Sequence, residues 1–306
     1  DTPGMRGRFA PSPTGPLHLG NLRTALVSWL QVHSAPSSAG SEWLVRMEDL
    51  DRITSSPAHE EGQLADLAAL GMVPDGEVVR QSERFALYHD AISTLRATGR
   101  VYECFCTRRE IQQAAAAPHG ELPEGAYPGT CRQLSAAAVR RRLAQGRPPA
   151  LRLRAEGERY TIDDLVAGQY VGVADDVVLQ RNDGVPAYNL AVVVDDAAQG
   201  VTDVVRGDDL LASTPRQLLL YDLLGLVSPR YAHVPLVLGP DGQRLAKRHG
   251  AVTFAQLAAR GLSAAEVLAR IGASLDLCSP TEAIDVDALA GRFAIDRVPR
   301  TPWQFG

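Results

Sequence analysis

The stretch that decides the fold reads Arg8-Phe9-Ala10-Pro11-Ser12-Pro13-Thr14-Gly15-Pro16-Leu17-His18-Leu19-Gly20-Asn21. A short strand leads into a turn rich in proline and glycine, and a helix is expected to begin near His18 because apolar residues then recur at helical spacing. The start of a helix offers free N–H groups and a partial positive charge to phosphates. The segment therefore predicts a nucleotide site; taken alone, a helix-capping turn with a surface histidine is the alternative. The apolar residues are Leu22, Leu26, Trp29 and Leu30.

Strand and helix signals alternate on both sides of this segment, and glycines follow several of the expected helices. Strands that alternate with helices form parallel βαβ units, so the fold class is α/β with an open parallel sheet. The expected strands are 6–10, 43–47, 190–194, 201–205 and 234–238, and the expected helices are 58–70, 83–98 and 215–224. Between them, 170–173 and 177–179 have β character, and the last ~60 residues indicate two or three short helices.

The composition excludes several classes of protein. The chain has 306 residues, of which 45% are hydrophobic and 22% charged, and this excludes a disordered chain, a coiled coil and a collagen-like fibre. A formal net charge of −5 excludes a protein that coats nucleic acid through charge alone. An RNA partner therefore needs a local basic patch, for which the candidates are Arg140, Arg141, Arg142, Arg152 and Arg154.

The cysteines are candidates for metal binding. The chain has no run near the roughly 18 to 20 apolar residues of a membrane span and no secretory signal at its start, so we expect a cytoplasmic protein. In a reducing compartment the four cysteines favour metal binding over disulfides. Cys104, Cys106 and Cys131 predict tetrahedral zinc with thiolate ligands and a fourth ligand still to be found; reduced thiols without metal are the alternative. Cys278 stands apart.

A second nucleotide-binding pattern lies near the C-terminus. Gln243-Arg244-Leu245-Ala246-Lys247-Arg248-His249-Gly250 follows a turn signature at 239–242. A basic loop after a strand is suited to close over a triphosphate, although such loops are usually solvated surface. This segment indicates a nucleotide-binding loop only when it is taken together with the segment around His18.

Together the two segments resemble the class I aminoacyl-tRNA synthetases. His18-Leu19-Gly20-Asn21 corresponds to the HIGH motif, and the stretch from Arg244 to Arg248 corresponds to the KMSKS motif. The second motif departs from the family at Arg244, where a lysine is usual, and at Ala246, where a serine is usual. The resemblance is to the glutamyl type, and it covers residues 6 to about 250. It rests on the segments 8–15, 46–51, 187–196 and 205–210.

Glutamate carries two carboxylates and one ammonium group, so its pocket needs cations and one anion. Arg8 and Arg206 are expected to bind carboxylates, Glu48 to bind the ammonium group, and Tyr188 to form the pocket wall. A simple ion pair between Arg46 and Glu48, or a core position for Tyr188, is the alternative. The resemblance implies glutamate binding by Arg8, Phe9, Ala10, Pro11, Ser12, Glu48, Tyr188 and Arg206.

The resemblance also implies a two-step reaction with ATP. The α-carboxylate of glutamate attacks the α-phosphorus of ATP, and catalysis is mostly positioning and charge stabilisation. His18 and Lys247 are expected as catalytic residues, with Mg²⁺ bound to the leaving pyrophosphate. The expected ATP-binding residues are His18, Gly20, Asn21 and Lys247.

For the cysteines, the resemblance implies that zinc is held by Cys104, Cys106, Tyr127 and Cys131. His119, inside the long loop that precedes Tyr127, is a rival ligand. Zinc in this position would be structural.

The acceptor is inferred from length. Only 56 residues follow Gly250, fewer than the helical anticodon-binding domain of a glutamyl-tRNA synthetase needs. The chain thus resembles the glutamyl-Q tRNA(Asp) synthetases, which implies queuosine in the anticodon stem-loop of tRNA(Asp) as acceptor. The alternatives are a truncated glutamyl-tRNA synthetase that charges a 3′ end, a small nucleotidyltransferase, and an inactive zinc-containing RNA-binding module. We expect a monomer.

The expected domain organisation is a Rossmann-like class I catalytic domain with an inserted zinc-bearing subdomain. Its parts are 1–103, the first half of the catalytic domain; 104–186, an insertion that contacts an RNA stem; 187–240, the second half; and 241–306, the KMSKS-type loop with a short helical segment.

Overall fold

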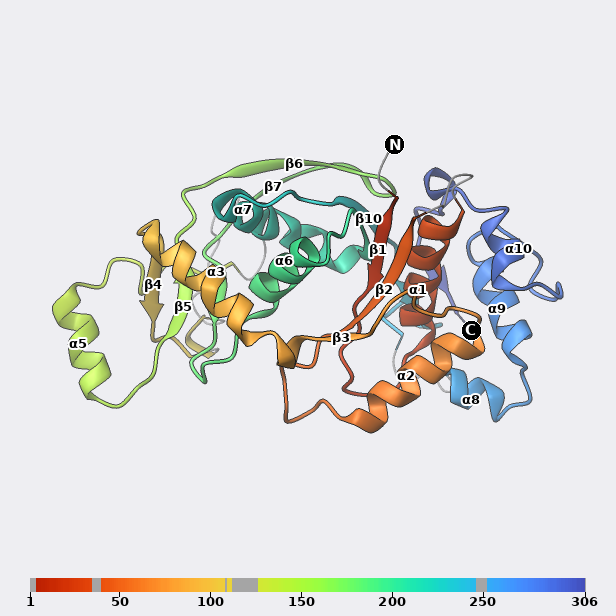
Figure 1. Ribbon diagram of the computed structural model, residues 1–306, viewed down its shortest axis with the longest axis horizontal. Helices are drawn as coiled ribbons and strands as arrows, with labels where there is room; N and C mark the ends of the chain where they lie inside the picture. The colour runs from red at the N-terminus through yellow and green to blue at the C-terminus, as the bar shows by residue number, and fades with distance from the viewer. Residues whose placement is uncertain (1–3, 35–39, 108, 112–125, 246–251, 306) are drawn as a thin grey trace.

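A five-stranded parallel sheet in the order β10-β9-β1-β2-β3 forms the centre of the protein (Figure 1). The computed structural model describes residues 4–34, 40–107, 109–111, 126–245 and 252–305. Each neighbouring pair of strands in this sheet is parallel, which confirms the predicted α/β class with its βαβ connections. The strands are β1 (Arg6–Phe9), β2 (Glu42–Met47), β3 (Val79–Arg80), β9 (Asp203–Gly207) and β10 (Arg230–Val234).

The predicted helices of this domain are confirmed within a few residues. The helix α1 (Leu19–His33) packs on β1 and β9, and its apolar residues Leu22, Leu26 and Leu30 are completely buried. In the part of the chain that the structure describes, no helix has both the length and the apolar character to cross a membrane. The other helices are α2 (Pro57–Ala69), α3 (Phe85–Ala97) and α7 (Thr214–Leu224).

The segment 190–194 is a helix, so the predicted strand there is wrong. It lies in α6 (Tyr188–Ala198), where every residue from Leu190 to Val194 is buried. A short run that is apolar on all sides has no period, and its three valines favoured a strand. The packing decides the matter, because α6 lies against α3 and α7 and is thus covered on several faces.

A second, antiparallel sheet lies at one end of the molecule (Figure 1). It contains β4 (Val101–Cys104), β5 (Ala150–Leu153) and β8 (Val178–Gln180), and the helix α5 (Ala136–Ala144) belongs to the same region. The hairpin of β6 (Arg159–Asp164) and β7 (Gly168–Val173) extends from this region to β10. The β character predicted near 170–173 and 177–179 is confirmed, whereas the domain boundaries stay a prediction.

The C-terminal segment contains the short helices that the sequence predicts, which are α8 (Phe254–Ala258), α9 (Ala264–Ala273) and α10 (Val286–Ala290). The predicted strand at 234–238 is interrupted, because Pro235 has no N–H for a sheet. β10 ends before it, and β11 (Val237–Leu238) pairs instead with β12 (Trp303–Gln304). Three short 3-10 helices complete the described elements, at Gln81–Glu83, Asp208–Ser213 and Ile295–Arg297.

The predicted basic patch is only partly available to RNA. Arg152 is 7% exposed, its guanidinium carbon lies 3.8 Å from the ring centre of Tyr127, and it donates to the carbonyl of Asp176. Its assignment to an RNA patch is therefore wrong, since the side chain serves internal packing. Arg140 and Arg141, on α5, are exposed.

Candidate active site

A pocket of about 250 Å³ lies where the carboxyl ends of the central strands meet the start of α1. In open parallel sheets this edge is the usual place for a ligand. The pocket brings together two groups of residues that the sequence associates with different ligands. From the ATP group these are His18, Gly20 and Asn21, and from the glutamate group Arg8, Phe9, Ala10, Glu48, Tyr188 and Arg206.

His18 caps the helix α1 and presents one defined tautomer. Its Nδ1 accepts hydrogen bonds from the backbone N–H groups of Gly20 and Asn21, at 3.0 and 3.3 Å, and the side chain of Asn21 accepts in return from the N–H of His18. The ring proton is therefore on Nε2. Burial lowers the pKa of His18, and the charge of Arg244 lowers it further. The residue is thus a neutral donor in the pocket.

Gly20 is required by the histidine beside it. A Cβ at this position would lie 2.8 Å from Cε1 and 3.0 Å from Nδ1 of His18. Any larger residue would displace the ring and break the cap. This contact is a reason for glycine that the sequence does not reveal.

Arg206 is a buried cation without a carboxylate partner among the described residues. It is 5% exposed and donates to Nε2 of His233 (2.9 Å), Oε1 of Gln217 (2.7 Å) and Oγ1 of Thr214 (2.9 Å). The guanidinium also packs against the ring of Tyr231, with 5.1 Å between its carbon and the ring centre. A buried charge of this kind needs compensation, which an anionic ligand supplies.

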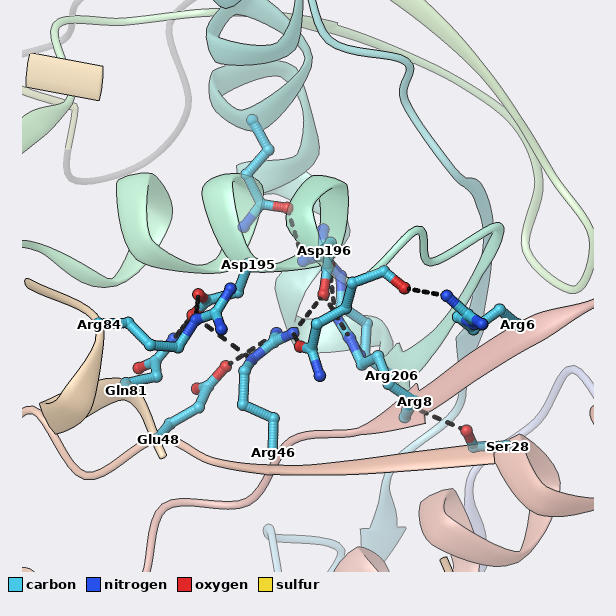
Figure 2. A network of polar contacts seen from close by, with 12 residues as sticks. Arg6, Arg8, Ser28, Arg46, Glu48, Gln81, Arg84, Asp195, Asp196 and Arg206 are labelled. Carbon is cyan, nitrogen blue, oxygen red and sulfur yellow. Dashed lines mark hydrogen bonds and ion pairs between the residues drawn. The ribbon is translucent and has the colours of Figure 1, made fainter. Parts of the chain in front are cut away.

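Arg8 and Arg46 are buried as well, but carboxylates neutralise them. Figure 2 shows Asp195 and Asp196 directed from α6 toward these two arginines. Asp196 accepts from Nε and Nη2 of Arg8, both at 3.2 Å, and from Nη1 of Arg46 at 2.7 Å. Arg8 lines the pocket, but its Nε and Nη2 already donate to Asp196. It therefore has fewer N–H groups available for a substrate carboxylate than the sequence predicts.

Asp195 ties this cluster to neighbouring elements. Its carboxylate accepts from Gln81, at 2.8 Å, and from Arg84, at 2.6 Å, and both residues appear in Figure 2. The hydroxyl of Tyr88 on α3 donates to it as well, at 2.8 Å. The carboxylate pair is thus a structural centre between α3, α6 and the first strands.

Glu48 is the pocket anion with an unusual pKa. Burial raises its pKa to about 7, although Arg46 and Arg8 act in the opposite direction. Arg46 lies 3.7 Å away, which is an ion-pair distance but longer than a hydrogen bond. Tyr188, at the start of α6, is 37% exposed and also lines the pocket, so it is not a core residue.

Other predicted site residues do not line the pocket or cannot be placed. Ser12 is exposed, and Pro11 contributes only a carbonyl that accepts from the N–H of Glu48. Lys247 and Ala246 lie outside the described residues, as does His119. Arg244 is described, and it forms an ion pair with Asp209 at 2.7 Å at the edge of the pocket.

Sequence reasoning missed several residues that line or support the site. Thr24 and Asp209 line the pocket, and His233 and Gln217 hold Arg206. Asp195 and Asp196 were also missed as the partners of the buried arginines. The sequence held a signal for them, because two adjacent aspartates at the end of an apolar run require buried cations nearby. The residues around Arg206 carry no comparable signal.

The three predicted cysteine ligands gather in one cluster. The sulfur atoms of Cys104, Cys106 and Cys131 all lie within 4.8 Å of one another. The hydroxyl of Tyr127 lies 3.3 Å from Sγ of Cys104 and 3.4 Å from Sγ of Cys106. Burial raises the pKa of Cys106 to about 11. The cluster has the composition of a site for a soft metal ion such as zinc.

Comparisons with known proteins agree with this geometry. The family model of the tRNA synthetases class I (E and Q), catalytic domain, matches residues 4–284. A glutamyl-Q tRNA(Asp) synthetase of Nocardia farcinica is 59% identical over 99% of this chain and 93% of its own length. A second one, of Symbiobacterium thermophilum, is 47% identical over 97% of this chain and 94% of its own length.

Among solved structures, a glutamate tRNA ligase from Elizabethkingia meningosepticum, in complex with its amino acid, superposes with a TM-score of 0.82 at 29% identity. The superposition covers 99% of this chain and 67% of that ligase. Fold, pocket and sequence similarity agree, and the chain belongs to the glutamyl-Q tRNA(Asp) synthetases, which have the catalytic domain of the class I synthetases for glutamate and glutamine.

Proposed function

We propose that the protein activates L-glutamate with ATP and transfers the glutamyl group to queuosine in the anticodon stem-loop of tRNA(Asp). The observation that supports the activation step is that one pocket joins the cap of α1 to Glu48, Tyr188 and Arg206. The acceptor is supported by the similarity to glutamyl-Q tRNA(Asp) synthetases. A nucleotide and an amino acid held in one pocket can react directly, because the α-carboxylate of glutamate then lies near the α-phosphate of ATP.

The residues of the pocket have complementary tasks in this reaction. Arg206 binds a carboxylate of glutamate, and Glu48 in its ionised form binds the ammonium group. His18, a neutral donor, binds a phosphate oxygen on which negative charge increases, and Lys247 is proposed to act on the same phosphates. Mg²⁺ bound with ATP supplies further positive charge at the pyrophosphate.

The acceptor is tested with labelled glutamate, ATP and tRNA(Asp) that either contains or lacks queuosine. We expect label only in the tRNA with queuosine, and we expect the label to resist removal of the 3′ terminal adenosine. Equal labelling of both tRNAs would indicate transfer to the 3′ end instead. No glutamate-dependent pyrophosphate exchange, with or without tRNA, would favour an inactive RNA-binding module.

We further infer that Cys104, Cys106 and Cys131, with Tyr127, hold a structural zinc ion. Tetrahedral zinc at about 2.3 Å from each sulfur separates the sulfurs by about 3.8 Å, and the sulfurs of Cys106 and Cys131 are 3.5 Å apart. Arg142 lies 4.0 Å from Sγ of Cys131, and Arg152 packs on Tyr127, so positive charge is close to the thiolates. The donor set therefore fits zinc.

Metal analysis of the purified protein tests the site. We expect about one zinc per chain, and a marked loss of zinc in Cys131→Ser because a three-ligand site binds less tightly. Cys278→Ser is the matched control, since Cys278 is apart from the cluster. Zinc well below one equivalent in the native protein, or unchanged zinc in Cys131→Ser, would contradict the assignment.

The cytoplasmic location and the monomeric state are also proposals. A tRNA substrate supports the first, and the second is tested by light scattering on the purified protein.

A further inference from the structure

The ring of His233 connects Arg206 to a carboxylate outside the pocket. Nε2 of His233 accepts from Nε of Arg206 at 2.9 Å, and Nδ1 lies 2.5 Å from Oδ2 of Asp164. Since Nε of arginine always carries a hydrogen, Nε2 of the histidine must be an acceptor. The ring proton is then on Nδ1 and is donated to Asp164. One tautomer of His233 is imposed by its two neighbours.

Asp164 is itself fixed in place at the tip of the β6–β7 hairpin. Its Oδ1 accepts from the backbone N–H groups of Val166, Ala167 and His233, at 3.0, 2.8 and 3.0 Å. The side chains of Asp164 and His233 are completely buried. The ring of Tyr231 stacks on that of His233 with 5.8 Å between their centres. The pair is therefore a rigid support on the side of Arg206 that faces away from the pocket.

The charge states agree with this geometry. Burial lowers the pKa of His233 and the charge of Arg206 lowers it further, which together outweigh the opposite effect of Asp164, so the ring is neutral. Burial alone would raise the pKa of Asp164, but hydrogen bonds from the ring and backbone of His233 hold it below its usual value. A neutral imidazole thus lies between a carboxylate and a guanidinium group.

We propose that Asp164 and His233 are positioning residues for glutamate recognition, which hold Arg206 in place as a cation without putting a carboxylate in contact with it. The inference rests on the proposed function, because it takes the ligand of Arg206 to be a glutamate carboxylate. A carboxylate in direct contact would neutralise Arg206 and compete with the substrate. The ring places the charge of Asp164 farther away, where it still stabilises the buried cation.

The count of donors supports this role. A guanidinium group has five N–H donors, and Arg206 uses three of them, on His233, Gln217 and Thr214. Among the described residues nothing else accepts from it through a side chain, and the residue lines the pocket. Two N–H groups thus remain for a bidentate contact with a carboxylate.

The test is Asp164→Asn, which keeps the shape and the acceptor for the backbone N–H groups. Its amide NH2 would face Nδ1 of His233 and favour the other tautomer, whose Nε2–H points at Nε–H of Arg206. In glutamate-dependent pyrophosphate exchange we expect the KM for glutamate to rise about 10- to 100-fold. The KM for ATP should stay within about twofold of the native value, since we propose that the cap of α1, and not Arg206, binds that substrate.

Two further comparisons separate positioning from general support. His233→Gln keeps an acceptor for Arg206. In this background, Asp164→Asn should raise the KM for glutamate by less than about twofold, because Asp164 acts on Arg206 only through the imidazole ring. His233→Leu, which offers no acceptor, should raise the KM for glutamate far more than His233→Gln. The matched control is Asp203→Asn, a buried aspartate on β9 that does not line the pocket. The proposal would be overturned if the KM increases of Asp164→Asn and His233→Gln multiplied in the double variant. Equal KM values for His233→Leu and His233→Gln would overturn it as well.

A spectroscopic measurement keeps this inference apart from the proposed function. The ¹⁵N chemical shifts of the His233 ring should report Nδ1–H in the native protein and Nε2–H in Asp164→Asn. An Nε2–H ring in the native protein would overturn the positioning role, whether or not the protein activates glutamate. Native protein without glutamate-dependent exchange but with the Nδ1–H ring would instead count against the proposed function.

Discussion

The two sides of the proposed glutamate pocket hold buried arginines in opposite ways. On one side, the carboxylate-paired group consists of Arg8 and Arg46 with Asp195 and Asp196. On the other, Arg206 has only uncharged acceptors among the described residues. All three arginines are at most 5% exposed, so burial does not explain the difference. The difference is that the protein supplies carboxylates to Arg8 and Arg46, whereas for Arg206 we propose that the ligand supplies the negative charge.

The comparison separates stability from binding. Charges that are paired within the protein contribute to the fold, and removing one partner leaves an uncompensated buried charge. A cation held by neutral groups contributes less to the fold but attracts an anion strongly, because water does not screen it. We therefore expect changes in the carboxylate-paired group to act mainly on stability, and changes at Arg206 to act mainly on glutamate binding.

The largest effect is expected from Arg206→Met. Loss of a buried charged donor costs about 2 to 5 kcal/mol, so kcat/KM for glutamate should fall by about 30- to 5,000-fold while ATP binding persists. Pyrophosphate exchange at varied glutamate measures it. Arg96→Met is the control, since Arg96 is an exposed residue of α3 that does not line the pocket. A kcat/KM within tenfold of the native value would contradict the role of Arg206 in glutamate binding.

The second-largest effect is expected in the carboxylate-paired group. Asp196→Asn leaves Arg8 and Arg46 without a full negative charge between them, and such a loss lowers the free energy of unfolding by about 3 to 5 kcal/mol. Urea unfolding measures it. Asp203→Asn, whose partner Arg230 is exposed, should lose about 1 kcal/mol or less. If Arg206→Met destabilises the protein more than Asp196→Asn does, the division between the two sides is wrong.

The smallest effect concerns pH. Burial raises the pKa of Glu48 from 4.5 to about 7, so the carboxyl is half ionised near neutral pH. Because the ammonium group of glutamate needs the ionised form, the KM for glutamate should fall about tenfold between pH 6 and 8. In Glu48→Gln this dependence should disappear and the KM should stay high. A flat profile in the native protein would contradict the role of Glu48.

The raised pKa of Glu48 also affects stability. As pH rises, glutamate binding should improve, whereas the contribution of Glu48 to stability should fall. Between pH 4.5 and 7 folded Glu48 binds more protons than unfolded Glu48 does, so its contribution to the free energy of unfolding falls as pH rises through this window. Glu48→Gln should remove that part of the slope. Urea unfolding at several pH values measures it.

Local patterns in the sequence predicted much of the site. The cap of α1 depends on residues within three positions of one another, and the helix follows from apolar spacing. The chemistry of a diacid with an ammonium group pointed to Arg206 and Glu48, which do line one pocket. The cysteine cluster followed from the spacing of Cys104, Cys106 and Cys131. In each case the determining chemistry lies in a short segment or in the residue type.

The errors have a common physical origin. The helical segment 190–194 was predicted as a strand because a run that is buried on all faces has no period. Arg152 was assigned to an RNA patch because its charge is visible in the sequence, whereas its packing on Tyr127 is not. Both depend on what surrounds the residue, and that is set by distant parts of the chain.

The sequence by itself determined the α/β class, the cap of the first helix and the residue types that a glutamate pocket needs. Only the tertiary structure decided which of the buried arginines has a carboxylate partner. That decision rests on Asp196, which lies 188 positions after Arg8, and on Asp164, which lies 69 positions before His233. Electrostatic interactions act through space at a few ångströms, so partners that the fold brings together leave no local pattern in the chain.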